Sequence, residues 1–172
     1  MVGSKNRFAQ EIVEAKFFDN LNSIDDLIKK ISKGYNFNNR GIQLTKGDIF
    51  EIFCEAYLST NPEYQVKEVY PQGYVPVKIR NKLKLSFQDK GYDGVYRTTD
   101  GNLHTYQAKF RTKSDKLNWA QDYKGGLSSF IGVSEQAHIR HLLATTNKVD
   151  GEFLSKPRIQ LTLLNDLKKL SK

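Results

Sequence analysis

Cysteine and long apolar runs are scarce in this chain, and each scarcity excludes a class of protein. The single cysteine, Cys54, cannot form an internal disulfide, which is typical of a reducing compartment and predicts a cytoplasmic protein. No apolar run approaches the roughly 20 residues of a membrane span. The N-terminus has no apolar signal segment, so we expect no export. Linkers, repeats and low-complexity tracts are also missing, which predicts one compact domain over 172 residues.

Two kinds of site are also poorly supported. The chain has no G-x-x-x-x-G-K-[ST] phosphate loop, so we expect no nucleotide-driven motor. Its three histidines, His104, His138 and His141, are scattered, and we expect no zinc site. Cys54 falls within an apolar helical stripe and is expected in the core.

Positive charge is in excess. Lys and Arg number 27 against 19 for Asp and Glu, a net charge of +8. Such a field favours polyanions, of which nucleic acid is the commonest. A surface that is basic only for solubility explains the charge equally well. No basic segment is a strongly amphipathic helix, so we expect no membrane partner.

Periodicity and capping residues predict helices, then strands, then helices and strands in alternation. The expected helices cover 7–20, 26–31, 46–58, 118–131 and 163–170, with a short basic helix after Pro76. The expected strands cover 64–70, 139–146 and 158–162, together with a hairpin in 89–111. This order predicts an α/β fold with a central mixed β-sheet flanked by helices.

The hairpin allows two registers. A two-residue turn at Asp100-Gly101 would pair Asp93 with Ala108. A three-residue loop, 99–101, with Gly101 in the left-handed conformation would place Asp93 opposite Gln107, with Lys109 on the same face. We infer the second, because it gathers a carboxylate, an amide oxygen and an ammonium at one point.

This cluster suits the hydrolysis of a phosphodiester. Asp93, the amide oxygen of Gln107 and the backbone carbonyl of Ala108 could bind Mg²⁺, which prefers oxygen ligands. Lys109 would orient the attacking water and stabilise charge on the phosphate. A turn aspartate with a surface ion pair to Lys109 is the simpler interpretation of the hairpin alone.

A second acid strengthens the first interpretation. On the helix that follows Thr45, Glu51 lies at the border between the apolar stripe and solvent, whereas Asp48 and Glu55 are expected to point to water. Glu51 is therefore the candidate for a further ligand, direct or through water. It could equally be an ordinary boundary glutamate.

Five blocks in order, "GDIFEIF", "DKGYDGVY", "YQAKF", "LLATTN" and "IQLTLLNDL", resemble the PD-(D/E)xK nuclease superfamily, and within it the Mrr-like restriction endonuclease branch with its Q-x-K strand. The resemblance spans about residues 45–170 and reaches the N-terminal nuclease domains of large restriction or helicase polypeptides. It leaves 1–44 as an N-terminal helical extension of a restriction-endonuclease-like core at 45–172.

The resemblance implies a metal-dependent DNA endonuclease of a restriction-modification or helicase-nuclease system. Asp93 and Gln107 become metal ligands, Lys109 the catalytic lysine and Glu51 the helix acid, with Mg²⁺ as cofactor and Mn²⁺ as its substitute. Gln107 departs from the usual Glu or Asp of the superfamily and should bind the metal more loosely. Asp89 is expected to be a turn residue or a support for a ligand.

The partner would be DNA, and candidate phosphate contacts follow the catalytic strand, at Arg111, Lys113, Lys116 and Lys124. A helicase, translocase or specificity domain outside this chain, and a homodimer, are further expectations. The form of nucleic acid stays open. So do two alternatives, a non-catalytic nucleic-acid-binding module that retains the fold and a structural domain.

Overall fold

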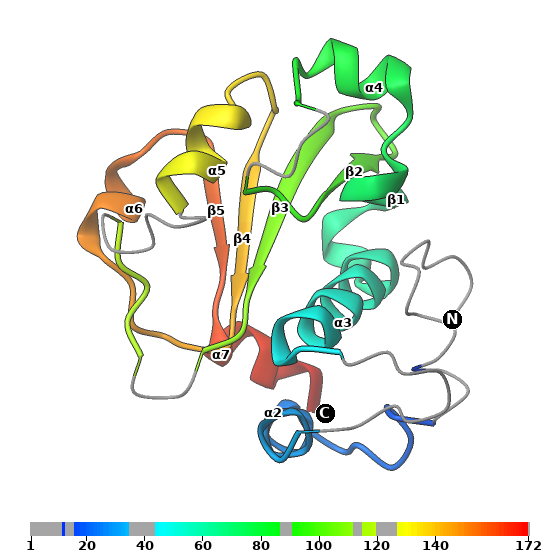
Figure 1. Cartoon of the computed structure of the whole chain (residues 1–172), viewed down its shortest axis with the longest axis vertical. Helices are drawn as coiled ribbons and strands as arrows, with labels where there is room; N and C mark the ends of the chain where they lie inside the picture. Colours follow the sequence, from blue (N-terminus) through cyan, green and yellow to red (C-terminus); the bar gives the residue numbers. More distant parts are fainter. Residues whose placement is uncertain are drawn as a thin grey trace.

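A five-stranded sheet in the order β1-β2-β3-β4-β5 forms the centre of the computed structural model (Figure 1). The structure describes residues 12, 16–34, 44–86, 91–111, 115–119 and 127–171. The strands are β1 (Val66–Pro71), β2 (Gly94–Thr98), β3 (Leu103–Lys109), β4 (Arg140–Ala144) and β5 (Ile159–Thr162). The first three strands pair antiparallel, and β3, β4 and β5 pair parallel. The predicted α/β fold with a mixed central sheet is confirmed.

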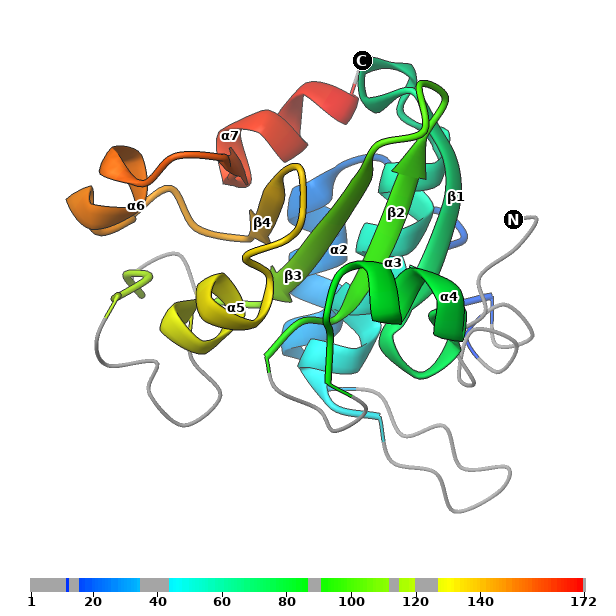
Figure 2. The ribbon, with the colours of Figure 1, turned by 90° about the horizontal axis from the view of Figure 1, so that it is seen from above.

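Helices cover both faces of this sheet (Figures 1 and 2). The helices are α2 (Ile24–Ser32), α3 (Lys46–Thr60), α4 (Val77–Lys82), α5 (Leu127–Val133), α6 (Gly151–Ser155) and α7 (Leu164–Leu167). Short 3-10 helices within the described residues are η1 (Pro62–Tyr64), η2 (Gln72–Tyr74) and η3 (Lys168–Ser171). The core clusters place α2, α3 and α7 on one face and α4, α5 and α6 on the other. Among the described residues, no helix has the length and apolar character needed to cross a membrane.

Alternation along the strands divides the core in two. Tyr106 and Leu143 point to the α3 face, and Val95 and Leu142 point to the opposite face. Successive side chains of a strand project to opposite faces, so both faces must be apolar when both are covered by helices. The central strands are therefore buried on both sides.

Local capping fixes the longest helix. Thr45 caps the first turn of α3 by accepting from the Asp48 amide at 3.1 Å, and the Asp48 carboxylate accepts from the Thr45 amide at 2.7 Å. The helix ends at Thr60, two residues before Pro62. Both ends lie close to their predicted positions.

One prediction about this helix is wrong. Glu55 was expected to point to water, yet it is only 3% exposed. The angular argument assumed a single buried face, whereas α3 packs against β1 and β3 on one side and α2 on another. A helix enclosed on more than one side buries residues outside its apolar stripe.

The hairpin between β2 and β3 has the inferred three-residue loop. The Thr98 amide donates to the Asn102 carbonyl at 3.1 Å, and Gly101 has φ +88°. Arg97 pairs with Leu103 and Gly94 with Tyr106, so the register is the one that the loop at 99–101 requires.

Three other elements differ from expectation. Residues 16–20, predicted as the end of a helix over 7–20, form turns, with Lys16 and Asn20 at positive φ. Phe18, which the apolar spacing had placed on the helix, is half-buried in these turns, and the buried residue here is its neighbour Phe17. In the helix predicted for 118–131, residues 118 and 119 are not helical, 120–126 lie outside the described residues, and α5 begins at Leu127; α6 was not predicted. The division at residue 44 stays a prediction, and residues 1–11, 13–15 and 35–43 lie outside the described residues.

Candidate active site

Asp93 lies directly before β2, where its backbone and side chain join two neighbouring segments. Its amide donates to the Tyr106 carbonyl at 2.9 Å, and its Oδ2 accepts from the Ala108 amide at 2.6 Å. The pairing of Gly94 with Tyr106, continued by one residue, sets Asp93 opposite Gln107. The structure thus brings together Asp93, Gln107 and the backbone of Ala108, as the hairpin register predicted.

Gln107 lies in the middle of this group and is 1% exposed. Its side-chain oxygen, Oε1, is buried and has no hydrogen-bond partner among the described residues. Buried polar atoms are nearly always paired, and an unpaired one loses roughly 1–3 kcal/mol of solvation. Lys109 lies two residues along β3 on the same face and is half-buried where the strand ends. The Gln107 amide oxygen thus lacks the partner that a buried polar atom normally has.

Glu51 reaches the group from α3 and is half-buried. Burial, followed by repulsion from Asp93, Asp48 and Glu55, raises the pKa of Glu51 to about 9, and attraction to Lys109 opposes this rise. A neighbouring like charge disfavours the ionised form of a carboxyl, and a neighbouring opposite charge favours it. The Glu51 carboxyl on α3 is therefore close enough to Asp93 and Lys109 to interact with the charges of both.

Tyr106 forms the floor of the group on the α3 face. Its side chain is fully buried, and burial followed by repulsion from Glu55, Asp93 and Glu51 raises the pKa of its hydroxyl. A Cβ at Gly94 would lie 2.5 Å from the ring atoms Cε1 and Cζ and from the hydroxyl oxygen. Glycine at this position lets the ring cross the start of β2 directly behind Asp93.

Thr145 was missed as a supporting residue. Its Oγ1 accepts from the Arg111 amide and donates to the Arg111 carbonyl, both at 2.7 Å, and its own amide donates to the Lys109 carbonyl at 3.3 Å. The side chain thus fixes the chain just beyond Lys109. Thr145 is 34 residues from Arg111, so only the small polar end of the "LLATTN" block hinted at this role.

The predicted phosphate contacts are only partly described. Arg111 is half-buried next to the end of β3, at the same edge of the sheet as Asp93. Lys116 is exposed and pairs with Asp150 at 3.8 Å. Lys113, Lys124 and Asp89 lie outside the described residues.

The donor set has a definite chemical character. No three His, Cys, Asp or Glu side chains gather as a ligand cluster within the described ranges. The group at Asp93 instead combines two carboxylates with a neutral amide oxygen and a backbone position. Oxygen donors without thiolate or imidazole suit Mg²⁺ or Mn²⁺. The unpartnered Gln107 Oε1 and the Asp93 carboxylate opposite it fit such an ion.

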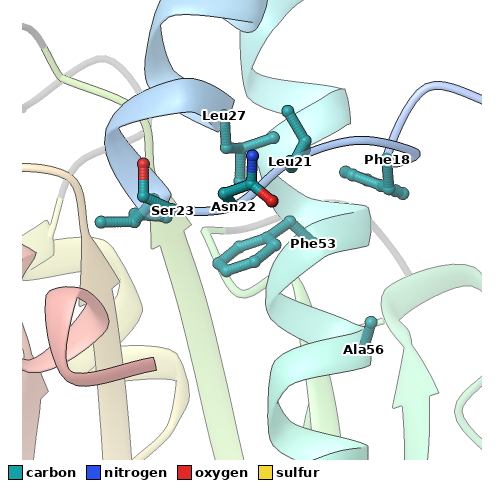
Figure 3. Close-up of a pocket in the computed structure, with 8 residues that line it drawn as sticks. Phe18, Leu21, Asn22, Ser23, Leu27, Phe53 and Ala56 are labelled. Carbon is teal, nitrogen blue, oxygen red and sulfur yellow. The ribbon is translucent and has the colours of Figure 1, made fainter. Parts of the chain in front are cut away.

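An apolar pocket lies elsewhere, between the segment before α2 and the middle of α3 (Figure 3). Its volume is about 280 Å³, and its walls include Phe18, Leu21, Leu27 and Phe53. It contains none of the residues gathered around Asp93. Its lining offers no acid, base or cation for catalysis.

Comparison with known proteins identifies similar folds. No protein-family model and no curated protein sequence matches the chain. The structure of the ATP-dependent Type ISP restriction-modification enzyme LlaBIII bound to DNA is similar, with a TM-score of 0.58, 21% identity and 85% of this chain covered. The DNA modification-dependent restriction endonuclease AspBHI is similar with a TM-score of 0.52, 18% identity and 99% covered. The aligned region is 8% and 38% of those chains, respectively.

Proposed function

We propose that the protein is a metal-dependent DNA endonuclease of the Mrr-like branch with a Q-x-K strand, which hydrolyses phosphodiester bonds with Mg²⁺. The observation that carries the proposal is the buried Oε1 of Gln107, which has no partner in the described structure and lies opposite the carboxylate of Asp93. The similarity of the fold to two restriction enzymes supports the same activity.

The residues of the site have distinct parts in this proposal. Asp93, the Gln107 amide oxygen and the Ala108 carbonyl would hold the ion, with Glu51 as a further ligand, direct or through water. Bound Mg²⁺ supplies Lewis acidity and lowers the pKa of water. The Lys109 ammonium would orient the attacking water and stabilise the charge that grows on the phosphate. Thr145 would fix the end of β3 and thereby position Lys109.

We further propose that the chain acts as the nuclease part of a restriction-modification or helicase-nuclease system. It corresponds to a small share of both similar enzymes, one of which is ATP-dependent. A separate domain or partner would then deliver the DNA. Cutting both strands would need two such sites, for example in a homodimer.

Supercoiled plasmid provides the test. The parent and Lys109→Ala are incubated with it in Mg²⁺, in Mn²⁺ and in EDTA, and nicked and linear forms are separated on a gel. We expect nicking by the parent in either metal and none in EDTA or by the variant. Lys67→Ala, an exposed lysine on β1, serves as the control for loss of one positive charge. Equal nicking by Lys109→Ala and the parent would refute the assignment of Lys109.

No cutting in either metal, with DNA binding intact in the parent, would instead favour the non-catalytic binding module. A second substrate, modified DNA, extends this test, because one similar enzyme is modification-dependent.

A further inference from the structure

A basic segment outside the predicted site lies at the end of the sheet that contains Asp93, where β1 ends and β2 begins. The segment, which we term the basic arm, comprises residues 72–86 and includes η2 and α4. It leaves β1 beside the start of β2, and the Gln72 amide donates to the Asp93 carbonyl at 2.8 Å. Figure 2 shows α4 and α5 on either side of the end of β3. The arm is thus attached directly to the residue that anchors the candidate site.

The arm is a fixed platform. Arg80 is 6% exposed, and its guanidinium donates to the carbonyls of Gln72 at 3.1 Å, Val75 at 3.4 Å and Ser86 at 3.2 Å. Leu83 is buried in the core cluster of that face. The buried Arg80 guanidinium therefore connects the two ends of the arm, and the lysines of the arm project from a backbone that these hydrogen bonds hold in place.

The outward side chains of the arm share one chemical character. Lys78, Lys82 and Lys84 are exposed, and the sequence from 72 to 86 contains no acidic residue. In the part of the chain that the structure describes, none of these three lysines forms an ion pair with a carboxylate. Tyr74 is 48% exposed and Val77 59%, next to these lysines. Lysines with an exposed aromatic ring suit phosphates and the bases or sugars between them.

Lys84 occupies a backbone position that favours glycine. It follows α4 with φ +53°, its amide donates to the Asn81 carbonyl at 3.1 Å, and the Leu85 amide donates to the Arg80 carbonyl at 3.0 Å. This is the Schellman arrangement at a helix end, in which the left-handed residue is usually glycine. A lysine here reduces stability, and its side chain forms no ion pair within the described chain, which points to a role outside the fold.

We propose that the basic arm binds the phosphate backbone of the DNA that enters the candidate site, through Lys78, Lys82 and Lys84. The inference rests on the proposed function for its ligand, and it adds a second contact surface, on the opposite side of β3 from Lys116. It also assigns Arg80 to positioning the arm rather than to contacting DNA.

The test compares two triple variants that each remove three positive charges. The arm variant is Lys78→Ala, Lys82→Ala and Lys84→Gly. The control is Lys67→Ala, Lys168→Ala and Lys169→Ala. These lysines lie at the other end of the sheet, where β1 begins, and Lys169 interacts there with the charge of Glu63. Binding of a labelled duplex is measured in EDTA over a series of salt concentrations, so that the metal site takes no part.

The arm variant should lose at least about tenfold in affinity near 0.1 M salt, and its log–log salt slope should fall by about 2–3, since each phosphate contact contributes about 0.9. The control should bind like the parent. Lys84→Gly alone should weaken binding while its melting temperature stays equal to or above that of the parent. This separates a binding role from a structural one.

Equal loss of affinity in both triple variants would overturn the proposal in favour of a diffuse charge effect. So would unchanged binding by the arm variant. Plasmid cleavage distinguishes this result from the proposed function. A parent that cuts DNA while the arm variant binds normally refutes the arm alone. A parent that binds through the arm yet never cuts refutes the nuclease alone.

Discussion

Replacement of Glu51 by glutamine should stabilise the metal-free protein, and the gain should grow with pH. The pKa of Glu51 is raised from 4.5 to about 9 in the folded state, first by burial and then by repulsion from Asp93. Between these two values the folded protein binds one more proton than the unfolded chain. Stability therefore falls as pH rises through this window, by about 1.36 kcal/mol per unit.

The expected magnitude follows from the width of that window. From pH 4.5 to about pH 7 the loss amounts to about 3 kcal/mol, and none of it arises when glutamine, which does not titrate, replaces the acid. Urea denaturation in EDTA, followed by circular dichroism at about pH 5 and about pH 7, measures the difference between variant and parent at each pH. Other titrating groups occur in both proteins and largely cancel.

A difference that is the same at both pH values would refute the electrostatic account of Glu51. The same samples with Mg²⁺ add a control for the proposed site. Metal should raise the unfolding midpoint of the parent by mass action, and it should raise that of Glu51→Gln less. A larger rise in the variant would exclude Glu51 as a ligand.

Three other substitutions test the surroundings of the site. Gly94→Ala should destabilise the protein by about 1–3 kcal/mol, because the new Cβ meets the enclosed Tyr106 ring at 2.5 Å; an unchanged denaturation midpoint would contradict this packing. Thr145→Val should lower the free energy of unfolding by about 1–3 kcal/mol and abolish plasmid nicking, because the amide and the carbonyl of Arg111 lose the hydroxyl that they bind. Thr145→Ser keeps the hydroxyl and should keep the stability and the nicking. Equal behaviour of the two variants would argue against the hydrogen bonds. His104→Phe should make the protein more resistant to unfolding by acid. Burial, with repulsion from His138, lowers the pKa of His104 from 6.5 to about 4. The parent therefore loses stability as pH falls through this range, by about 2 kcal/mol at pH 5, and the variant does not. Parallel acid denaturation curves for the parent and this variant would refute the shift.

Local chemistry explains what could be predicted from the sequence. The loop at 99–101 needs a left-handed residue in third place, and Gly101 supplies it. From that turn the register follows residue by residue, and with it the meeting of Asp93 and Gln107. The start of α3 follows equally from Thr45 and Asp48.

Features that depend on packing from outside an element could not be predicted in this way. Glu55 is buried where α3 packs on the sheet, close enough to Tyr106 to raise the pKa of its hydroxyl, and the pattern of one helix does not contain this neighbour. Thr145, after β4, forms a hydrogen bond with Arg111, after β3. The basic arm is joined to Asp93 by a hydrogen bond from the Gln72 amide to the Asp93 carbonyl. The turns at 16–20 contain a half-buried Phe18, which apolar spacing alone interprets as part of a helix.

Metal binding is the most direct test of the site, because it requires neither the right DNA nor a partner. Mn²⁺ binding is followed by the electron paramagnetic resonance signal of the free ion, with the parent and Asp93→Asn. The substitution leaves an oxygen that can still accept from the Ala108 amide, which Asp93 binds at 2.6 Å, so the hairpin should persist. We predict uptake of Mn²⁺ by the parent, displacement by Mg²⁺, and a large loss of affinity in Asp93→Asn. Equal uptake by both proteins, or none by the parent, would contradict a metal site at Asp93 and Gln107.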